Sequence, residues 1–271
     1  MEQRFPTVSP STKLVRIFHR SNASALTLRP WGTVDAEHPA DGRFDDPNGL
    51  EGQSSDPQKH ARYRLIYSAS TYTGALRESL QDFSPAPAFN AAMVDIVDDD
   101  DPREGEERLP TFDKSYGIVP PSWFDTRYAG EIIVHKAAVV DTTIVEFCDA
   151  LAREDVARIT PDLLVGPNRA YTKPLGVFFF TAPERFDGLA YRSHLDLGEI
   201  AYAFYSVDGH GSELRAKLST GEGWEIDPAS DDVADVINAL RLRIAGDRGV
   251  TPAAELFNDA RTAEPKETNN G

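Results

Sequence analysis

The spacing of hydrophobic positions divides the first part of the chain into short strands and an amphipathic helix. Residues 14–19 and 63–70 are rich in β-branched and aromatic side chains, which predicts two strands. From Tyr72 onward the apolar side chains follow a helical period, and they are Tyr72, Ala75, Leu76, Leu80 and Phe83. This pattern predicts a helix that follows the second strand and ends before Pro85.

The second half of the chain adds more strands and two further helices. Val, Ile, Phe and Tyr are enriched in residues 131–141, 176–181 and 200–207, which predicts three strands. Amphipathic patterns predict helices at residues 143–159 and 231–244. We therefore expect an α+β fold that is dominated by strands.

Polar segments rich in Pro, Gly, Ser or acidic residues are expected to be loops or flexible ends. They are residues 1–12, 21–41, 48–60, about 91–110, 110–128 and 259–271. The acidic excursion at about 91–110 is the most polar, because residues 95–108 hold eight acids and two arginines. We expect a single domain over residues 13–248, with residues 1–12 and 259–271 flexible.

The charge balance limits the classes of partner. The chain has 44 acidic and 28 basic residues, and its formal net charge is −16. Such a chain repels phosphate backbones and anionic membranes, so neither direct nucleic-acid binding nor membrane binding is expected. The sequence has no signal-peptide pattern and no apolar run near the roughly 18 residues of a membrane span, so we expect a cytoplasmic protein.

Several kinds of reactive site do not fit the residue pattern. Cys148 is the only cysteine, which rules out an intrachain disulfide and a thiolate zinc site. The six histidines lack metal-ligand spacing and the acidic run lacks an EF-hand pattern, so no metal site is expected. Ser193 and His194 are neighbours near the start of an expected late strand, where their side chains should point to opposite faces and form no hydrolase dyad. The sequence GHG at residues 209–211 is no dinucleotide fingerprint, so hydride transfer is not expected.

Five residues in separated motifs are candidates for a shared site. Arg16 lies in LVRIFHR, Arg43 in GRFDDP, and Ser193 in GLAYRSHLDLG. Tyr67 and Glu78 lie eleven positions apart in YSASTYTGALRESL. In this order the motifs resemble the RES-domain family over residues 14–207. The chain departs from that family by having Phe-Asp after Arg43, where many relatives have Trp-Asn, and by its polar and acidic insertions.

The resemblance implies a fold and a reaction. It implies an ADP-ribosyltransferase-like fold with a β-strand-rich core and flanking helices. It also implies that NAD is consumed as a substrate, with no cofactor, by cleavage of the bond between nicotinamide and ribose. The leaving group is already cationic and needs no general acid, and its departure leaves an oxocarbenium-like ribose that a carboxylate can stabilise.

The same resemblance implies roles for the five residues. Glu78 would stabilise the ribose cation, and Ser193 would bind the ribose or position Glu78. Arg16 and Arg43 would bind the pyrophosphate, for which a planar guanidinium is suited. Tyr67 would stack on nicotinamide or form a wall of the pocket. The catalytic set is thus Glu78, Ser193 and Arg43.

Each of these residues also has an ordinary interpretation. Glu78 falls on the helix flank opposite the Tyr72–Leu76–Leu80 stripe, where a glutamate is normally just solvated. Arg43 could form a surface ion pair with the acids that follow it. Arg16 lies inside an apolar strand and needs a partner, which could be an internal carboxylate. Tyr67 could be a core tyrosine and Ser193 an ordinary strand residue.

Three functions remain open from the sequence. The first is an NAD glycohydrolase or phosphorylase acting as a bacterial toxin, with NAD as substrate and a separate DNA-binding antitoxin as partner. The second is a mono-ADP-ribosyltransferase with a protein acceptor. The third is a non-catalytic nucleotide-binding or interaction module. The sequence also leaves a homo-oligomer open.

Overall fold

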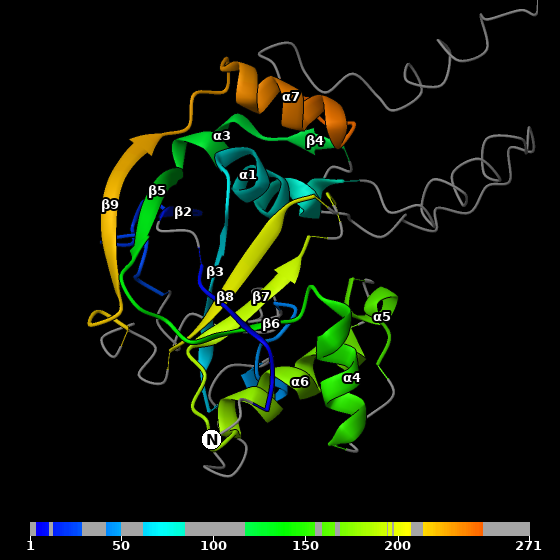
Figure 1. Cartoon of the computed structure of the whole chain (residues 1–271). Coiled ribbons are helices and arrows are strands. Elements are labelled where there is room, and N and C mark those ends of the chain that lie inside the picture. Colours follow the sequence, from blue (N-terminus) through cyan, green and yellow to red (C-terminus); the bar gives the residue numbers. More distant parts are fainter. Residues whose placement is uncertain are drawn as a thin grey trace, which may run out of the picture.

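An eight-stranded sheet forms the centre of the molecule (Figure 1). The computed structural model describes residues 4–10, 13–28, 42–49, 62–84, 117–154, 159–165, 169–193, 195–196, 198–206 and 214–245. The strand order of the eight-stranded sheet is β1-β6-β7-β8-β3-β2-β5-β9. Among these described strands, only β6 and β7 pair in parallel. The strands are β1 (Thr7–Val8), β2 (Lys13–His19), β3 (Arg64–Ala69), β5 (Arg127–Val134), β6 (Val139–Asp141), β7 (Gly188–Arg192), β8 (Ile200–Ser206) and β9 (Leu218–Glu225).

The helices form two separate groups around this sheet (Figure 1). One group consists of α1 (Tyr72–Leu80), α3 (Pro121–Asp125) and α7 (Asp231–Ala239). It lies beside a small parallel pair made by β4 (Ile118–Val119) and β10 (Arg243–Ile244). The other group consists of α4 (Val145–Arg153), α5 (Pro161–Val165) and α6 (Arg169–Thr181). Two short 3-10 turns, η2 (Pro47–Gly49) and η4 (Gln81–Phe83), complete the described elements.

Each part of the sheet buries a different set of apolar side chains. The α4–α6 group packs on β3, β7 and β8, and the α1–α3–α7 group packs on β2 and β5. The other face of the sheet holds a third cluster that includes Leu14, Ile66, Ile132 and Phe204. Alternation along the strands separates these clusters, since Ile66 faces one side and its neighbour Leu65 faces the other. The mixed α+β class with a strand-rich core is confirmed.

Strand direction brings two distant segments together at one edge of the sheet. β3 and β7 both pair antiparallel with β8, so they run in the same direction. Their carboxyl-terminal ends therefore lie at the same edge. Helix α1 begins just after β3, and Ser193 directly follows β7, so both segments reach that edge.

The prediction of a strand at residues 176–181 is wrong, because this segment is the end of helix α6. Its phenylalanine-rich sequence has high β propensity, which tertiary packing overrides here. Thr172, Leu175, Gly176 and Phe179 are buried, and their spacing places them on one face of a helix against the core.

Other element boundaries also differ from the prediction. The predicted strand at 131–141 is two strands, β5 and β6, and the helix predicted at 143–159 is α4, which ends at Arg153. The helix predicted at 231–244 ends at Ala239, because Arg241 adopts a left-handed φ of 54°. Leu242 N then donates to the Ile237 carbonyl at 2.8 Å, which closes the helix with a Schellman-type turn.

Part of the polar sequence belongs to the fold. In the segment expected to be a flexible lead-in, Phe5 is 1% exposed and β1 pairs with β6. The predicted connection at 110–128 contains β4 and α3. The acidic excursion at 91–110, most of the 48–60 loop and residues 259–271 lie outside the described residues. No helix in the described part of the chain has the length and apolar character needed to cross a membrane.

Candidate active site

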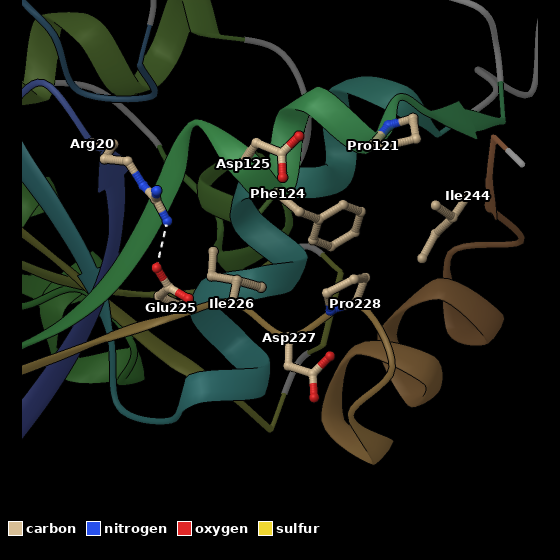
Figure 2. A pocket seen from close by; sticks show the side chains of 9 residues that line it. All are labelled: Arg20, Pro121, Phe124, Asp125, Glu225, Ile226, Asp227, Pro228 and Ile244. Atoms are coloured by element: carbon tan, nitrogen blue, oxygen red, sulfur yellow. Dashed lines mark hydrogen bonds and ion pairs between the residues drawn. The ribbon is translucent and has the colours of Figure 1, made fainter. Parts of the chain in front are cut away.

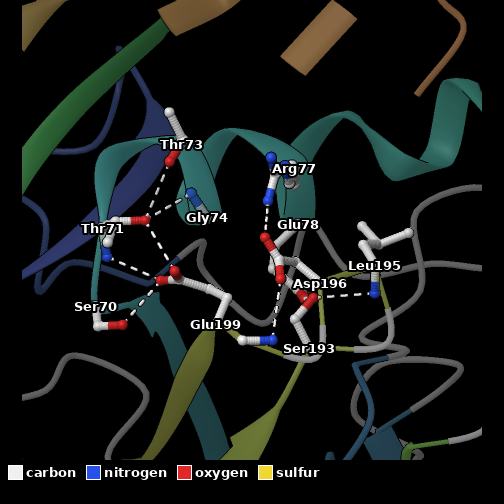
Figure 3. A network of polar contacts seen from close by, with 11 residues as sticks. Ser70, Thr71, Thr73, Gly74, Arg77, Glu78, Ser193, Leu195, Asp196 and Glu199 are labelled. Carbon is white, nitrogen blue, oxygen red and sulfur yellow. Dashed lines mark hydrogen bonds and ion pairs between the residues drawn. The ribbon is translucent and has the colours of Figure 1, made fainter. Parts of the chain in front are cut away.

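Glu78 and Ser193 meet at the edge where β3 and β7 end (Figure 3). Ser193 Oγ donates a hydrogen bond to Glu78 Oε1 at 2.6 Å. Glu78 is half-buried on α1 and points away from Leu76 and Leu80, which face the core. Ser193 is buried and directly follows β7, rather than lying near the start of a strand. The flank predicted for Glu78 therefore faces another segment of the chain.

Tyr191 lies between this pair and Arg43. It is two residues before Ser193 and its ring is buried. Burial raises the pKa of the Tyr191 hydroxyl well above its ordinary value, and the negative charge of Glu78 raises it further. On the other side, the Arg43 guanidinium carbon lies 5.7 Å from the centre of the Tyr191 ring, within the range of a cation–π contact.

The GRFDDP loop that carries Arg43 is fixed by its own acidic residues. Asp45 Oδ2 accepts a hydrogen bond from Gly42 N at 2.6 Å. Asp46 accepts from the backbone of Asn48 at 3.0 Å and of Arg62 at 2.9 Å. The two acids after Arg43 therefore shape the loop through backbone contacts.

Helix α6 binds the backbone of Arg43, and helix α5 binds its guanidinium. Thr172 Oγ1 on α6 donates to the Arg43 carbonyl at 2.6 Å. Arg43 Nη1 donates to the carbonyls of Leu164 at 2.5 Å and Val165 at 3.0 Å, at the end of α5. The carbonyl groups at a helix end carry partial negative charge, which suits a cation. The structure thus places the guanidinium beside Tyr191 and not out in solvent.

Tyr67 belongs to the same cluster. Its hydroxyl accepts from Phe44 N at 3.0 Å and donates to Asp45 Oδ1 at 3.3 Å. Its ring meets that of Tyr191 edge-on, with the ring centres 6.4 Å apart. Burial raises the pKa of the Tyr67 hydroxyl well above its ordinary value, so the group is neutral. Tyr67 thereby joins β3 to the loop that carries Arg43.

Arg16 lies on the opposite face of the sheet. Val15 pairs with Ala69, so Arg16 alternates away from the face that carries Tyr67. Its Nη1 donates to the carbonyls of Ala25 at 2.6 Å and Thr27 at 3.2 Å. Burial lowers the pKa of the Arg16 guanidinium to about 10. The structure therefore brings four of the five predicted residues together and places Arg16 elsewhere.

Two residues of this region, Tyr191 and Glu199, were not predicted from the sequence. Tyr191 had a usable signal, because residues two apart on a strand share a face and Ser193 was already a candidate. Glu199 had none. It is 8% exposed and accepts hydrogen bonds from Ser70 Oγ and Thr71 N, both at 2.9 Å, and from Thr71 Oγ1 at 3.0 Å (Figure 3).

A separate cavity of about 480 Å³ lies away from this cluster, between α3, β10 and the segment that joins β9 to α7 (Figure 2). Its apolar lining includes Phe124, Ile226 and Ile244, and Arg20 and Glu225 pair at 2.8 Å across one side. It contains none of the predicted site residues. Across the residues that the structure describes, no group of three or more His, Cys, Asp or Glu side chains is arranged to hold a metal ion.

Comparisons with known proteins leave the family open. No family model matches the chain, and no curated protein matches it. The chain is similar to a solved structure, the crystal structure of the M. tuberculosis MbcT–MbcA toxin–antitoxin complex, with 13% sequence identity and a TM-score of 0.48. The match covers 88% of this chain and 92% of that chain.

Proposed function

We propose that the protein is an NAD-consuming enzyme that cleaves the bond between nicotinamide and ribose, as an NAD glycohydrolase or phosphorylase. One observation carries the proposal: the Glu78 carboxylate accepts a 2.6 Å hydrogen bond from Ser193 beside an aromatic and guanidinium cluster. A carboxylate can stabilise the ribose cation, aromatic rings can form the wall of a nicotinamide pocket, and a guanidinium can bind the pyrophosphate of NAD.

Glu78 would act on the ribose. When the bond between C1′ and nicotinamide breaks, its electron pair leaves with nicotinamide, which becomes neutral, and positive charge develops on the ribose. A carboxylate held close to that charge stabilises the transition state. Ser193 occupies Glu78 Oε1 and so orients the carboxylate, and Oε2 is the oxygen that we assign to the ribose. Water or phosphate then bonds to C1′ and releases a proton.

Arg43 and the two tyrosines would bind the rest of the substrate. A guanidinium has five N–H donors, and the α5 carbonyls hold Arg43 through Nη1. We assign its positive charge to the pyrophosphate, and we assign the rings of Tyr67 and Tyr191 to the pocket wall. Arg16 lies on the other face of the sheet. Of the two arginines, we therefore assign only Arg43 to pyrophosphate binding.

The sequence resemblance extends the proposal to a biological setting. An enzyme that destroys NAD would stop bacterial growth, so we propose that the protein is a cytoplasmic toxin. A separate DNA-binding antitoxin would then hold it inactive. Transfer of ADP-ribose to a protein is the alternative outcome, because it needs the same pocket and differs only in the acceptor.

The test is nicotinamide release by the purified protein. NAD is incubated with wild type, with Glu78→Gln and with Ser193→Ala, each with and without phosphate. We expect Glu78→Gln to lower the rate about 100-fold or more, because the developing charge loses its carboxylate. Glu225→Gln is the matched control, since Glu225 is an exposed acid that lines the separate cavity, and its substitution should leave the rate unchanged.

Labelled NAD identifies the acceptor. Label found in free ADP-ribose indicates water, label in a phosphorylated ADP-ribose indicates phosphate, and label on a protein band indicates ADP-ribosyl transfer. No nicotinamide release by wild type in either buffer, or equal release by Glu78→Gln, would reject the proposal.

A further inference from the structure

We propose that Glu199 is a positioning residue that holds helix α1 so that the Glu78 carboxylate stays on Ser193. The kinetic part of this inference rests on the proposed function, whereas its structural part does not. In the described structure the hydrogen bonds of the Glu199 carboxylate go to Ser70 and Thr71, and not to Glu78, Arg43, Tyr67 or Tyr191. Glu199 would act through the helix that carries Glu78.

The Glu199 carboxylate binds the start of α1. It accepts from Ser70 Oγ and Thr71 N through Oε1, and from Thr71 Oγ1 through Oε2, at 2.9 to 3.0 Å. Thr71 is the N-cap of α1 and accepts from Gly74 N at 3.0 Å. A carboxylate at this end of a helix is also favoured by the helix dipole.

Gly74 shows how closely the carboxylate packs on the helix. A Cβ added at Gly74 would lie 2.4 Å from Glu199 Oε1, closer than non-bonded atoms can approach. Only a residue without a side chain lets the first turn of α1 rest on Glu199. Glu78 is four residues after Gly74, one helical turn further along. The position of this turn therefore sets the position of Glu78.

A backbone hydrogen bond joins Glu199 to Ser193. Ser193 N donates to the Glu199 carbonyl at 3.1 Å, and Glu199 N donates to the Asp196 carbonyl at 2.9 Å. The contacts form a closed ring, from Glu199 to the start of α1, along α1 to Glu78, and through Ser193 back to Glu199. A rigid helix in such a ring cannot move at one contact without moving at the other.

The ion pair between Arg77 and Asp196 also links α1 to the segment that contains Asp196 and Glu199. Its side chains are 23% and 40% exposed, and solvent weakens an exposed pair. Glu199 is 8% exposed and has three hydrogen bonds. We therefore assign the positioning of α1 to Glu199 rather than to Asp196.

The kinetic test compares Glu199→Ala with Glu199→Gln. Loss of the carboxylate should lower kcat about 10- to 100-fold, because a small displacement of a reacting group has an effect of this size. KM should change less than about twofold, because Arg43, Tyr67 and Tyr191 lie on other elements. Glutamine can accept from Ser70 and Thr71 N and donate to Thr71 Oγ1, so Glu199→Gln should stay within about threefold of wild type.

Gly74→Ala disturbs the same contact from the helix side. It should lower kcat like Glu199→Ala, and it replaces that variant if Glu199→Ala does not fold. In the double variant the alanine methyl group enters the space left by the carboxylate. The two effects on kcat should therefore be clearly less than multiplicative, which residues that act through one contact show.

Hydrogen–deuterium exchange of residues 72–80 tests the inference without any activity. Exchange should be faster in Glu199→Ala and near the wild-type rate in Glu199→Gln. If wild type releases no nicotinamide, the proposed function fails while this contrast still tests the role of Glu199. Unchanged exchange and kcat in Glu199→Ala, or multiplicative effects in the double variant, would overturn the inference. A change in KM alone would do the same.

Discussion

Gly176 shows how a single residue without a side chain positions the candidate site. It lies on α6, where an added Cβ would be 2.2 Å from the Phe44 carbonyl oxygen and 2.6 Å from the Tyr63 hydroxyl. Tyr63 donates to that same carbonyl at 2.9 Å. The close approach lets α6 hold the loop that carries Arg43.

We expect Gly176→Ala to lower the free energy of unfolding by about 1–3 kcal/mol, because the added methyl group forces backbone atoms apart. The gain in helix propensity, about 1 kcal/mol at most, offsets only part of this loss. Urea unfolding gives the value. Gly223→Ala is the control, since its Cβ would lie 3.5 Å from the Ala129 carbonyl and should change stability by less than about 0.5 kcal/mol. Equal effects of the two substitutions would contradict the prediction.

Sequence patterns locate candidate residues more reliably than they decide which of them meet. The helical wheel places Glu78 off the core stripe, and the structure agrees. For Arg16, alternation shows only that it shares a face with residues two apart on its own strand. Its face relative to Tyr67 depends on the pairing of Val15 with Ala69, which is set by long-range sheet register.

At the scale of elements, the end of α7 shows a local conformation that hydrophobic spacing cannot reveal. The apolar stripe continues to Ile244, yet the helix ends at Ala239. Arg241 takes a left-handed conformation there, where glycine is the usual residue. The absence of a glycine removed the signal that normally predicts such an end.

Arg241→Gly should raise the free energy of unfolding by about 0.5–1 kcal/mol, because a side chain disfavours this conformation. Thermal unfolding measures the shift. Arg241→Ala retains a Cβ and therefore should give no such gain. A similar gain from alanine would mean that the arginine side chain, and not the backbone, causes the strain.

The error at α6 has a different cause. Consecutive phenylalanines favour a strand by propensity, and only the buried set at Thr172, Leu175 and Phe179 shows the helical period. Strand β9 was missed for the opposite reason, since most of its side chains are exposed and two of its interior residues are glycines. Its pairing with β5 determines its structure.

At the scale of the whole molecule, buried tyrosines connect the fold to pH. Burial raises the pKa of Tyr63, Tyr67, Tyr191 and Tyr205 above the ordinary value of 10.0. These hydroxyls stay protonated in the folded chain and ionise near their ordinary value once it unfolds. The folded state therefore binds more protons above pH 10, and its stability falls as pH rises from there.

We expect the contribution of these tyrosines to the free energy of unfolding to be constant below about pH 9 and to fall above about pH 10. Tyrosinate absorbance of Tyr63, Tyr67, Tyr191 and Tyr205 should rise together with the loss of far-ultraviolet circular dichroism. Full ionisation of all nine tyrosines in a chain with native circular dichroism would contradict the prediction.

The α+β class was predictable because it follows from local patterns, whereas the strand order joins segments that are far apart in the sequence. The site depends on this order. Ser193 reaches Glu78 only because β3 and β7 flank β8 and end at one edge.

The long sequence separation between Glu78 and Ser193 affects when the site can form during synthesis. Glu78 and Ser193 are 115 positions apart, and a ribosome takes on the order of ten seconds to add that many residues. During that interval the growing chain has its carboxylate but not the serine that orients it. If the protein consumes NAD, a nascent chain is harmless to the cell that makes it. In that case, activity would begin only once the later half of the sheet has been synthesised and has folded onto the earlier half.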